Sequence, residues 1–121
     1  MTIYNHLPVY KASYELFLEI FKTVKDFNRE YKYTIGENIK KESIEMIVDI
    51  YRANSSFSKK SQIEKAREKI ETIRVLFRLI KDLRQISLIK FVEINEKIED
   101  ISRQLTAWER SQKQRAGIVH G

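Results

Sequence analysis

Apolar side chains recur every three or four residues through most of this chain, which is the spacing of one face of an α-helix. The pattern predicts four helices, over about residues 8–27, 35–54, 61–84 and 87–110. Pro8 suits the start of the first helix, because an N–H at that position would have no partner within the helix.

Polar residues before three of these helices predict how each one begins. Thr34 with Glu37, and Ser61 with Glu64, have the spacing of a capping box, in which each side chain binds the other residue's backbone N–H. Ser87 is a third candidate cap.

Two polar stretches separate the first three helices. Residues 28–36 are predicted to form a loop that ends in Gly36. The stretch "YRANSSFSKKS" (51–61) contains the end of the second helix, and Asn54 is predicted to end that helix in the left-handed conformation. The serines then compete for backbone hydrogen bonds and disfavour further helix.

Long helices with short connections are typical of an all-α, up-down-up-down antiparallel four-helix bundle. We expect one such domain over residues 1–112 and a flexible tail over 113–121, where the apolar pattern is lost. An open array of helical hairpins and a helix-turn-helix domain are alternatives, but these helices are long for a DNA-reading unit.

The apolar arcs of the first and third helices are wider than one core requires. A bundle helix needs an apolar stripe somewhat wider than about 100°. In the third helix the apolar side chains cover roughly 200°, at about 100° per residue. The excess surface predicts self-association, and half-exposed tyrosines at the rim of a monomer are the alternative.

Composition narrows the class of protein. The chain has no cysteine and a net charge of +6. The absence of cysteine excludes disulfides and fits a reducing compartment. The sequence has no recognisable signal peptide and no apolar run long enough to span a bilayer, so we expect a cytoplasmic protein without membrane contact.

The residues needed for common catalytic and metal sites are missing. The two histidines, His6 and His120, both lie outside the predicted helices. No Gly-rich phosphate loop and no His-Glu-x-x-His motif occurs, and Ser–His and Cys–His nucleophiles have no central histidine or cysteine. We therefore expect no enzyme activity, no cofactor, no metal site and no small-molecule substrate.

A basic stripe is predicted along the third helix. Arg67, Arg74, Arg78 and Lys81 fall within roughly 60° of one another on a helical wheel. Arginine is well suited to bidentate phosphate contacts, and the preceding loop adds two lysines, Lys59 and Lys60. The stripe predicts nucleic-acid or partner binding. The alternative is a solvated surface of ion pairs, since acidic residues lie at helical neighbour spacing.

Four segments resemble one protein family in order: "LPVYKASYELFLEIF" (7–21), "YKYTIGENIKKESIEMIVDIYRAN" (31–54), "RLIKDLRQIS" (78–87) and "QLTAWERS" (104–111). They are similar to the accessory variability determinant (Avd) family of diversity-generating retroelements. The same broad family includes proteins encoded in intervening sequences of 23S ribosomal RNA genes.

The resemblance implies a homopentameric ring of four-helix bundles with a positively charged surface. It implies a non-enzymatic partner that binds the retroelement reverse transcriptase together with RNA or DNA, in the synthesis of mutagenised cDNA. Arg78 and Lys81 lie in the matching third segment and Arg52 in "YRAN", so these positions are the expected contacts. The alternative is a ribosomal-RNA-associated or structural bundle without a polymerase partner.

Overall fold

Four long helices and one short helix make up the chain in this computed structural model, which describes residues 7–55 and 59–120, with side chains up to residue 114. No strand occurs in these residues. The helices are α1 (Pro8–Val24), α2 (Arg29–Lys32), α3 (Ile35–Ser55), α4 (Lys60–Asp82) and α5 (Leu88–His120).

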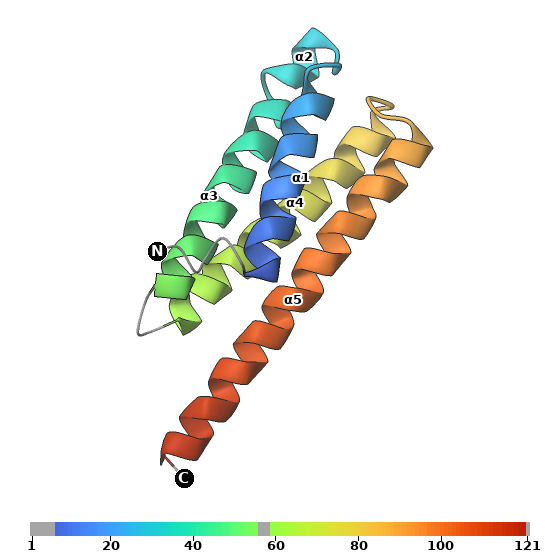
Figure 1. Cartoon of the computed structure of the whole chain (residues 1–121). Helices are drawn as coiled ribbons and strands as arrows, with labels where there is room; N and C mark the ends of the chain where they lie inside the picture. The colour runs from blue at the N-terminus through green and yellow to red at the C-terminus, as the bar shows by residue number, and fades with distance from the viewer. Residues whose placement is uncertain (1–6, 56–58, 121) are drawn as a thin grey trace.

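The long helices run alternately up and down as an antiparallel bundle (Figure 1). Helix α1 packs mainly against α3 and α5, and α4 packs against the same two helices. Helix α2 and the α4–α5 turn lie at one end of the bundle, and the end of α3 and the start of α4 lie at the other (Figure 1). The predicted all-α four-helix bundle is confirmed.

Each long helix contributes one stripe of apolar side chains to a shared core. Leu16, Met46, Phe77 and Ile98 represent the four helices in that core, and each is at most 1% exposed. Burying one such side chain contributes about 1.5–3 kcal/mol, so the summed stripes outweigh the modest helix propensities of the individual segments.

The first two connections differ in detail from the sequence prediction. Helix α1 ends at Val24, and the predicted loop contains the one-turn helix α2. The Thr34 hydroxyl donates to the Glu30 carbonyl at 2.7 Å, and Glu37 pairs with Lys40 at 2.7 Å. The predicted capping box is therefore wrong, because α2 offers Thr34 a closer partner than the first turn of α3.

The α3–α4 connection also begins and ends differently. Helix α3 continues through Asn54 to Ser55, and no described residue there has a positive φ. The Lys59 ammonium donates to the carbonyls of Ala53 and Asn54, at 2.9 and 3.1 Å. This lysine satisfies the end of α3 in place of a left-handed asparagine. Residues 56–58 lie outside the described residues.

Two of the other predicted helix ends can be compared with the structure. Helix α4 begins at Lys60, so Ser61 lies inside the helix and the predicted cap is wrong. The Ser87 hydroxyl accepts a hydrogen bond from the Lys90 N–H at 3.1 Å, which confirms the third cap.

Helix α5 is longer than the sequence pattern predicts. It continues to His120 instead of ending near residue 110, and it extends past the other helices at its C-terminal end (Figure 1). Residues 109–116 are mostly Glu, Gln, Lys, Arg and Ala, which favour helix without any apolar periodicity. The predicted tail from residue 113 is thus helical as far as His120. Its flexibility stays a prediction.

A left-handed residue closes the turn between α4 and α5. Arg84 has φ 58°, and its N–H donates to the Lys81 carbonyl at 3.0 Å. The Gln85 N–H donates to the Ile80 carbonyl, also at 3.0 Å. These two bonds form the Schellman motif that usually has glycine at the left-handed position.

The side chain of Gln85 ties this turn to the neighbouring connection. Its Oε1 accepts a hydrogen bond from the Asn28 N–H at 2.7 Å, and its Nε2 donates to the Leu83 carbonyl at 2.9 Å. One glutamine therefore links the start of α2 to the end of α4.

Gly36 allows the start of α3 to approach the end of α1. A Cβ at this position would lie 2.7 Å from Val24 Cγ1 and 3.2 Å from the Tyr31 carbonyl oxygen. The branched Val24 side chain has little rotamer freedom with which to move aside. The glycine within "YTIG" therefore belongs to a close helix contact in the first turn of α3, and the predicted loop ending at Gly36 is wrong.

We predict that Arg84→Gly raises the free energy of unfolding by about 0.5–1 kcal/mol, because glycine removes the cost of a left-handed side chain. Urea unfolding measures the change. Arg103→Gly is the matched control, since Arg103 is an exposed arginine inside α5; it should lower stability by about 1 kcal/mol. A lower free energy of unfolding for Arg84→Gly would contradict the idea that the left-handed conformation of Arg84 costs stability.

Candidate nucleic-acid interface

The predicted basic stripe lies along the seam between α4 and α5. The Arg67 guanidinium pairs with Glu109, a carboxylate whose side chain is only 11% exposed. Arg74 pairs with Glu99 across the seam and with Glu71 on its own helix, the latter at 3.0 Å. These two arginines therefore join two helices of the bundle.

The C-terminal half of the stripe is less constrained. The Lys81 ammonium lies 5.0 Å from the centre of the Phe91 ring and 3.8 Å from an Asp82 oxygen. Arg78 is exposed, and no ion pair joins it to another described residue. Of the four predicted residues, Arg78 is the one whose charge is fully available to a partner.

The remaining predicted residues lie at the opposite end of the bundle, at the α3–α4 connection. Arg52 and Lys60 are exposed, while Lys59 is engaged with the end of α3. Asp49 pairs with Lys69 of α4 at 3.0 Å. The structure therefore separates Arg52, Lys59 and Lys60 from Arg78 and Lys81 by most of the bundle length.

The Asp49–Lys69 pair is partly buried, with side chains 8% and 20% exposed. Burial by itself would lower the pKa of the Lys69 ammonium. The hydrogen bond to Asp49 and the charge of that carboxylate outweigh burial, so the pKa of Lys69 is raised. Lys69 is thus a structural cation that stays charged, and it is not available as a general base.

The groove between α1 and α5 is acidic. Its lining includes Glu15, Glu93, Glu96 and Asp100, with Lys97 as the one cation among the lining residues. This surface would repel phosphates, so the positive surface of the molecule lies elsewhere.

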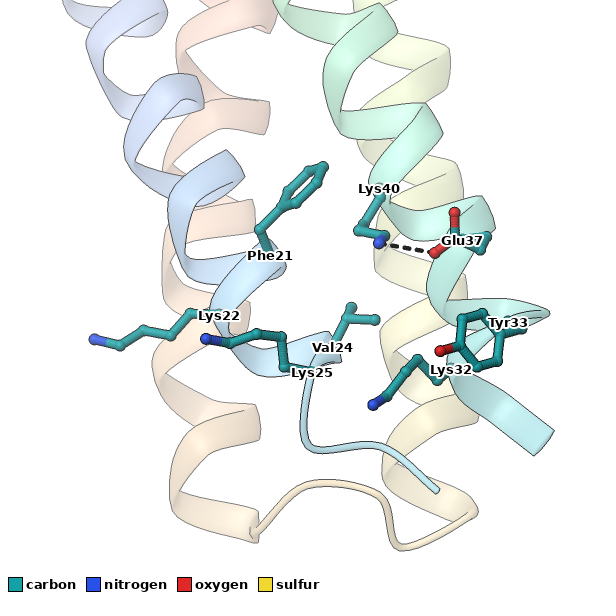
Figure 2. A pocket seen from close by; sticks show the side chains of 8 residues that line it. All are labelled: Phe21, Lys22, Val24, Lys25, Lys32, Tyr33, Glu37 and Lys40. Atoms are coloured by element: carbon teal, nitrogen blue, oxygen red, sulfur yellow. Dashed lines mark ion pairs between the residues drawn. The ribbon is translucent and has the colours of Figure 1, made fainter. Parts of the chain in front are cut away.

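A lysine-rich pocket at the α2 end was missed by the sequence analysis. Its volume is about 470 Å³, and Figure 2 shows its lining side chains. They come from the end of α1, from α2 and its C-cap, and from the start of α3: Phe21, Lys22, Val24, Lys25, Lys32, Tyr33, Glu37 and Lys40. The lysines are separated by a loop in the sequence, so helical periodicity does not group them.

The sequence model of the bAvd-like family matches residues 9–112. This chain belongs to the bAvd-like family. A comparison with curated proteins gives no match. The family match spans all four long helices and confirms the resemblance inferred from the four sequence segments.

Members of the bAvd-like family are accessory, non-catalytic proteins. In the described part of this bAvd-like chain, no group of three or more His, Asp or Glu side chains could hold a metal ion. None of its described helices combines the length and apolar character needed to cross a membrane.

A further ion pair joins α1 to α5 and gives stability a pH dependence. The Lys90 ammonium lies 2.8 Å from Glu19 and 3.2 Å from Glu93. The hydrogen bond from Lys90 lowers the pKa of Glu19. The hydrogen bonds to Glu19 and Glu93 raise the pKa of Lys90.

We predict that Glu19→Gln lowers the thermal unfolding midpoint near neutral pH. A carboxylate with a lowered pKa stabilises the fold above its unfolded pKa of about 4.3, and this contribution is lost as pH falls through the folded value. The difference from the native protein should therefore shrink below about pH 4. It should also shrink as pH rises through the raised pKa of Lys90, above about 10.

Glu15→Gln is the matched control for this pH series, since Glu15 lies one turn earlier on α1 and is exposed. It should leave the unfolding midpoint nearly unchanged at every pH. A Glu19→Gln deficit of constant size from pH 3 to pH 8 would contradict the ion-pair explanation.

Proposed function

We propose that this chain is a non-enzymatic accessory protein of a diversity-generating retroelement. In this role it binds the reverse transcriptase and the template RNA or cDNA in the cytoplasm and supports mutagenic copying into a target gene. The observation that carries the proposal is membership of the bAvd-like family over residues 9–112. The net charge of +6 is consistent with a nucleic-acid partner.

We propose further that copies of the chain assemble into a homopentameric ring through the outer side of α1 and α3. Large apolar side chains are exposed there at helical spacing on both helices. The apolar face consists of Tyr14, Leu18, Ile44, Val48 and Tyr51, each between 37% and 51% exposed. Exposed apolar side chains on two packed helices favour burial against another copy.

We propose that the reverse transcriptase binds on the outer side of α4 and α5. Arg78 is surrounded along α4 by the exposed residues Val75 and Leu79, which precede and follow it on the solvent side. Leu88 and Val92 are exposed on the facing start of α5. An available arginine among exposed apolar side chains is typical of the centre of a protein–protein interface.

We predict that Arg78→Glu weakens binding of the reverse transcriptase at least about thirtyfold while leaving helicity and oligomeric mass unchanged. Co-purification with the polymerase, followed by titration, measures this effect. Arg74→Glu is the comparison variant: it should lower the unfolding midpoint, because Glu99 and Glu71 would face a like charge.

If the Arg78→Glu variant recovers as much polymerase as the native protein, Arg78 is not part of the polymerase interface. No recovery by the native protein, with a reverse transcriptase from the same retroelement, would favour the ribosomal-RNA-associated or structural alternative.

We predict that Ile44→Lys converts the pentamer to a monomer without unfolding the bundle, because Ile44 is 45% exposed and lies outside the intramolecular core. Light scattering should give five times the 14.5 kDa chain mass for the native protein and one chain mass for the variant. Ile89→Lys on α5, where the side chain is 75% exposed, should keep the native mass. If the Ile44→Lys variant is still a pentamer, the subunit interface does not lie on the outer side of α1 and α3.

A further inference from the structure

The lysine pocket concentrates available positive charge. Lys22, Lys25 and Lys32 form no ion pair in the described part of the chain. Glu37 is the only acidic residue in the lining, and it pairs with Lys40 at 2.7 Å, as Figure 2 shows. One acid is thus neutralised within the pocket wall. The ammonium groups of Lys25 and Lys32 remain for a ligand in the pocket, and that of Lys22 extends away from Tyr33, at the edge of the pocket (Figure 2).

The start of α3 adds to this positive potential. Tyr33 of the lining precedes α3, and Glu37 lies in its first turn. The N-terminus of an α-helix carries the positive end of the helix dipole. The dipole of α3 therefore adds to the attraction of the lysines for an anion in the pocket.

The pocket also offers an aromatic surface. Tyr33 is 64% exposed, which makes it the most exposed aromatic side chain among the described residues. Phe21 and Val24 supply the apolar part of the wall (Figure 2). Phosphate-binding cations beside an exposed ring are the combination with which proteins hold single strands, since every base can stack on a ring.

We propose that this pocket binds single-stranded nucleic acid, with backbone phosphates on Lys22, Lys25 and Lys32 and one base stacked on Tyr33. A double helix is a poorer ligand, because its bases are already stacked on one another. The inference rests on the proposed function and deepens it, by placing the nucleic-acid contact at the α2 end of the bundle. The predicted stripe on α4 is largely occupied by its own ion pairs.

The test measures binding of a labelled single-stranded RNA oligonucleotide by fluorescence anisotropy, over a series of salt concentrations. The pocket variant carries Lys22→Gln, Lys25→Gln and Lys32→Gln. The control variant carries Lys11→Gln, Lys65→Gln and Lys113→Gln, which removes the same charge from three exposed lysines outside the pocket. Circular dichroism and light scattering check that each variant keeps the native helicity and mass.

The pocket variant should bind RNA at least about tenfold more weakly, and its salt slope should fall by about 2, since each lost phosphate contact on a single strand contributes about 0.7. Tyr33→Ala should weaken binding about fivefold or more, whereas Ile89→Ala, at an exposed apolar residue outside the pocket, should not. Equal losses in the pocket and control variants would overturn the proposal. If the pocket variant unfolds, Lys25→Glu alone replaces it, with Lys11→Glu as its control.

A competition experiment distinguishes binding of a nucleic-acid strand from binding of a smaller ligand that carries phosphate. An excess of inorganic pyrophosphate or of a mononucleotide should displace the RNA only weakly. Displacement at the concentrations at which the oligonucleotide itself competes would overturn the assignment to a strand. Equal affinity for duplex RNA, with Tyr33→Ala neutral, would also overturn it.

Failure of the pocket assignment can be distinguished from failure of the proposed function. Recovery of the reverse transcriptase together with unaltered RNA binding by the pocket variant would refute only this inference. Loss of RNA binding in the pocket variant, without any recovery of polymerase by the native protein, would support the pocket and refute the retroelement role.

Discussion

Burial of one aliphatic stripe from each long helix is the constraint on which this molecule depends. Most of the fully buried side chains are isoleucines, among them Ile20, Ile50, Ile70 and Ile98. Their branched side chains have few rotamers to lose on packing, and a close-packed interior penalises any change of shape. The outer helix faces take no part in this core, so their charges and exposed apolar groups can differ from side to side.

The outer faces differ in whether ion pairs join the neighbouring helices. Ion pairs join α3 to α4 through Asp49 and Lys69, and α1 to α5 through Glu19 and Lys90. Two further pairs join α4 to α5. Among the described residues no ion pair joins α1 to α3, where Lys40 lies over the Phe21 ring instead. The ion pairs between α3 and α4, α1 and α5, and α4 and α5 oppose sliding of these helices past one another. The outer side of α1 and α3 instead exposes apolar side chains.

Helical periodicity was sufficient to predict the four-helix bundle, because one face of every long helix is buried. It could not predict which ions pair across helices. Glu71 lies three residues before Arg74 and could be named from the sequence, but Glu99 and Glu109 come near the stripe only through the register of α4 against α5. The extra length of α5 was missed because a helix that extends past its neighbours needs no apolar stripe. The lysine pocket could not be predicted from periodicity, because its lining residues come from three elements that only the fold brings together.

The length of α3 sets the spacing between the two ends of the bundle that carry available cations. Its 21 residues span about 31 Å, at about 1.5 Å per residue. A single strand that touched both the α2 end and the Arg52 end of one subunit would therefore have to span about 31 Å. A strand too short to reach that far can occupy only one end at a time.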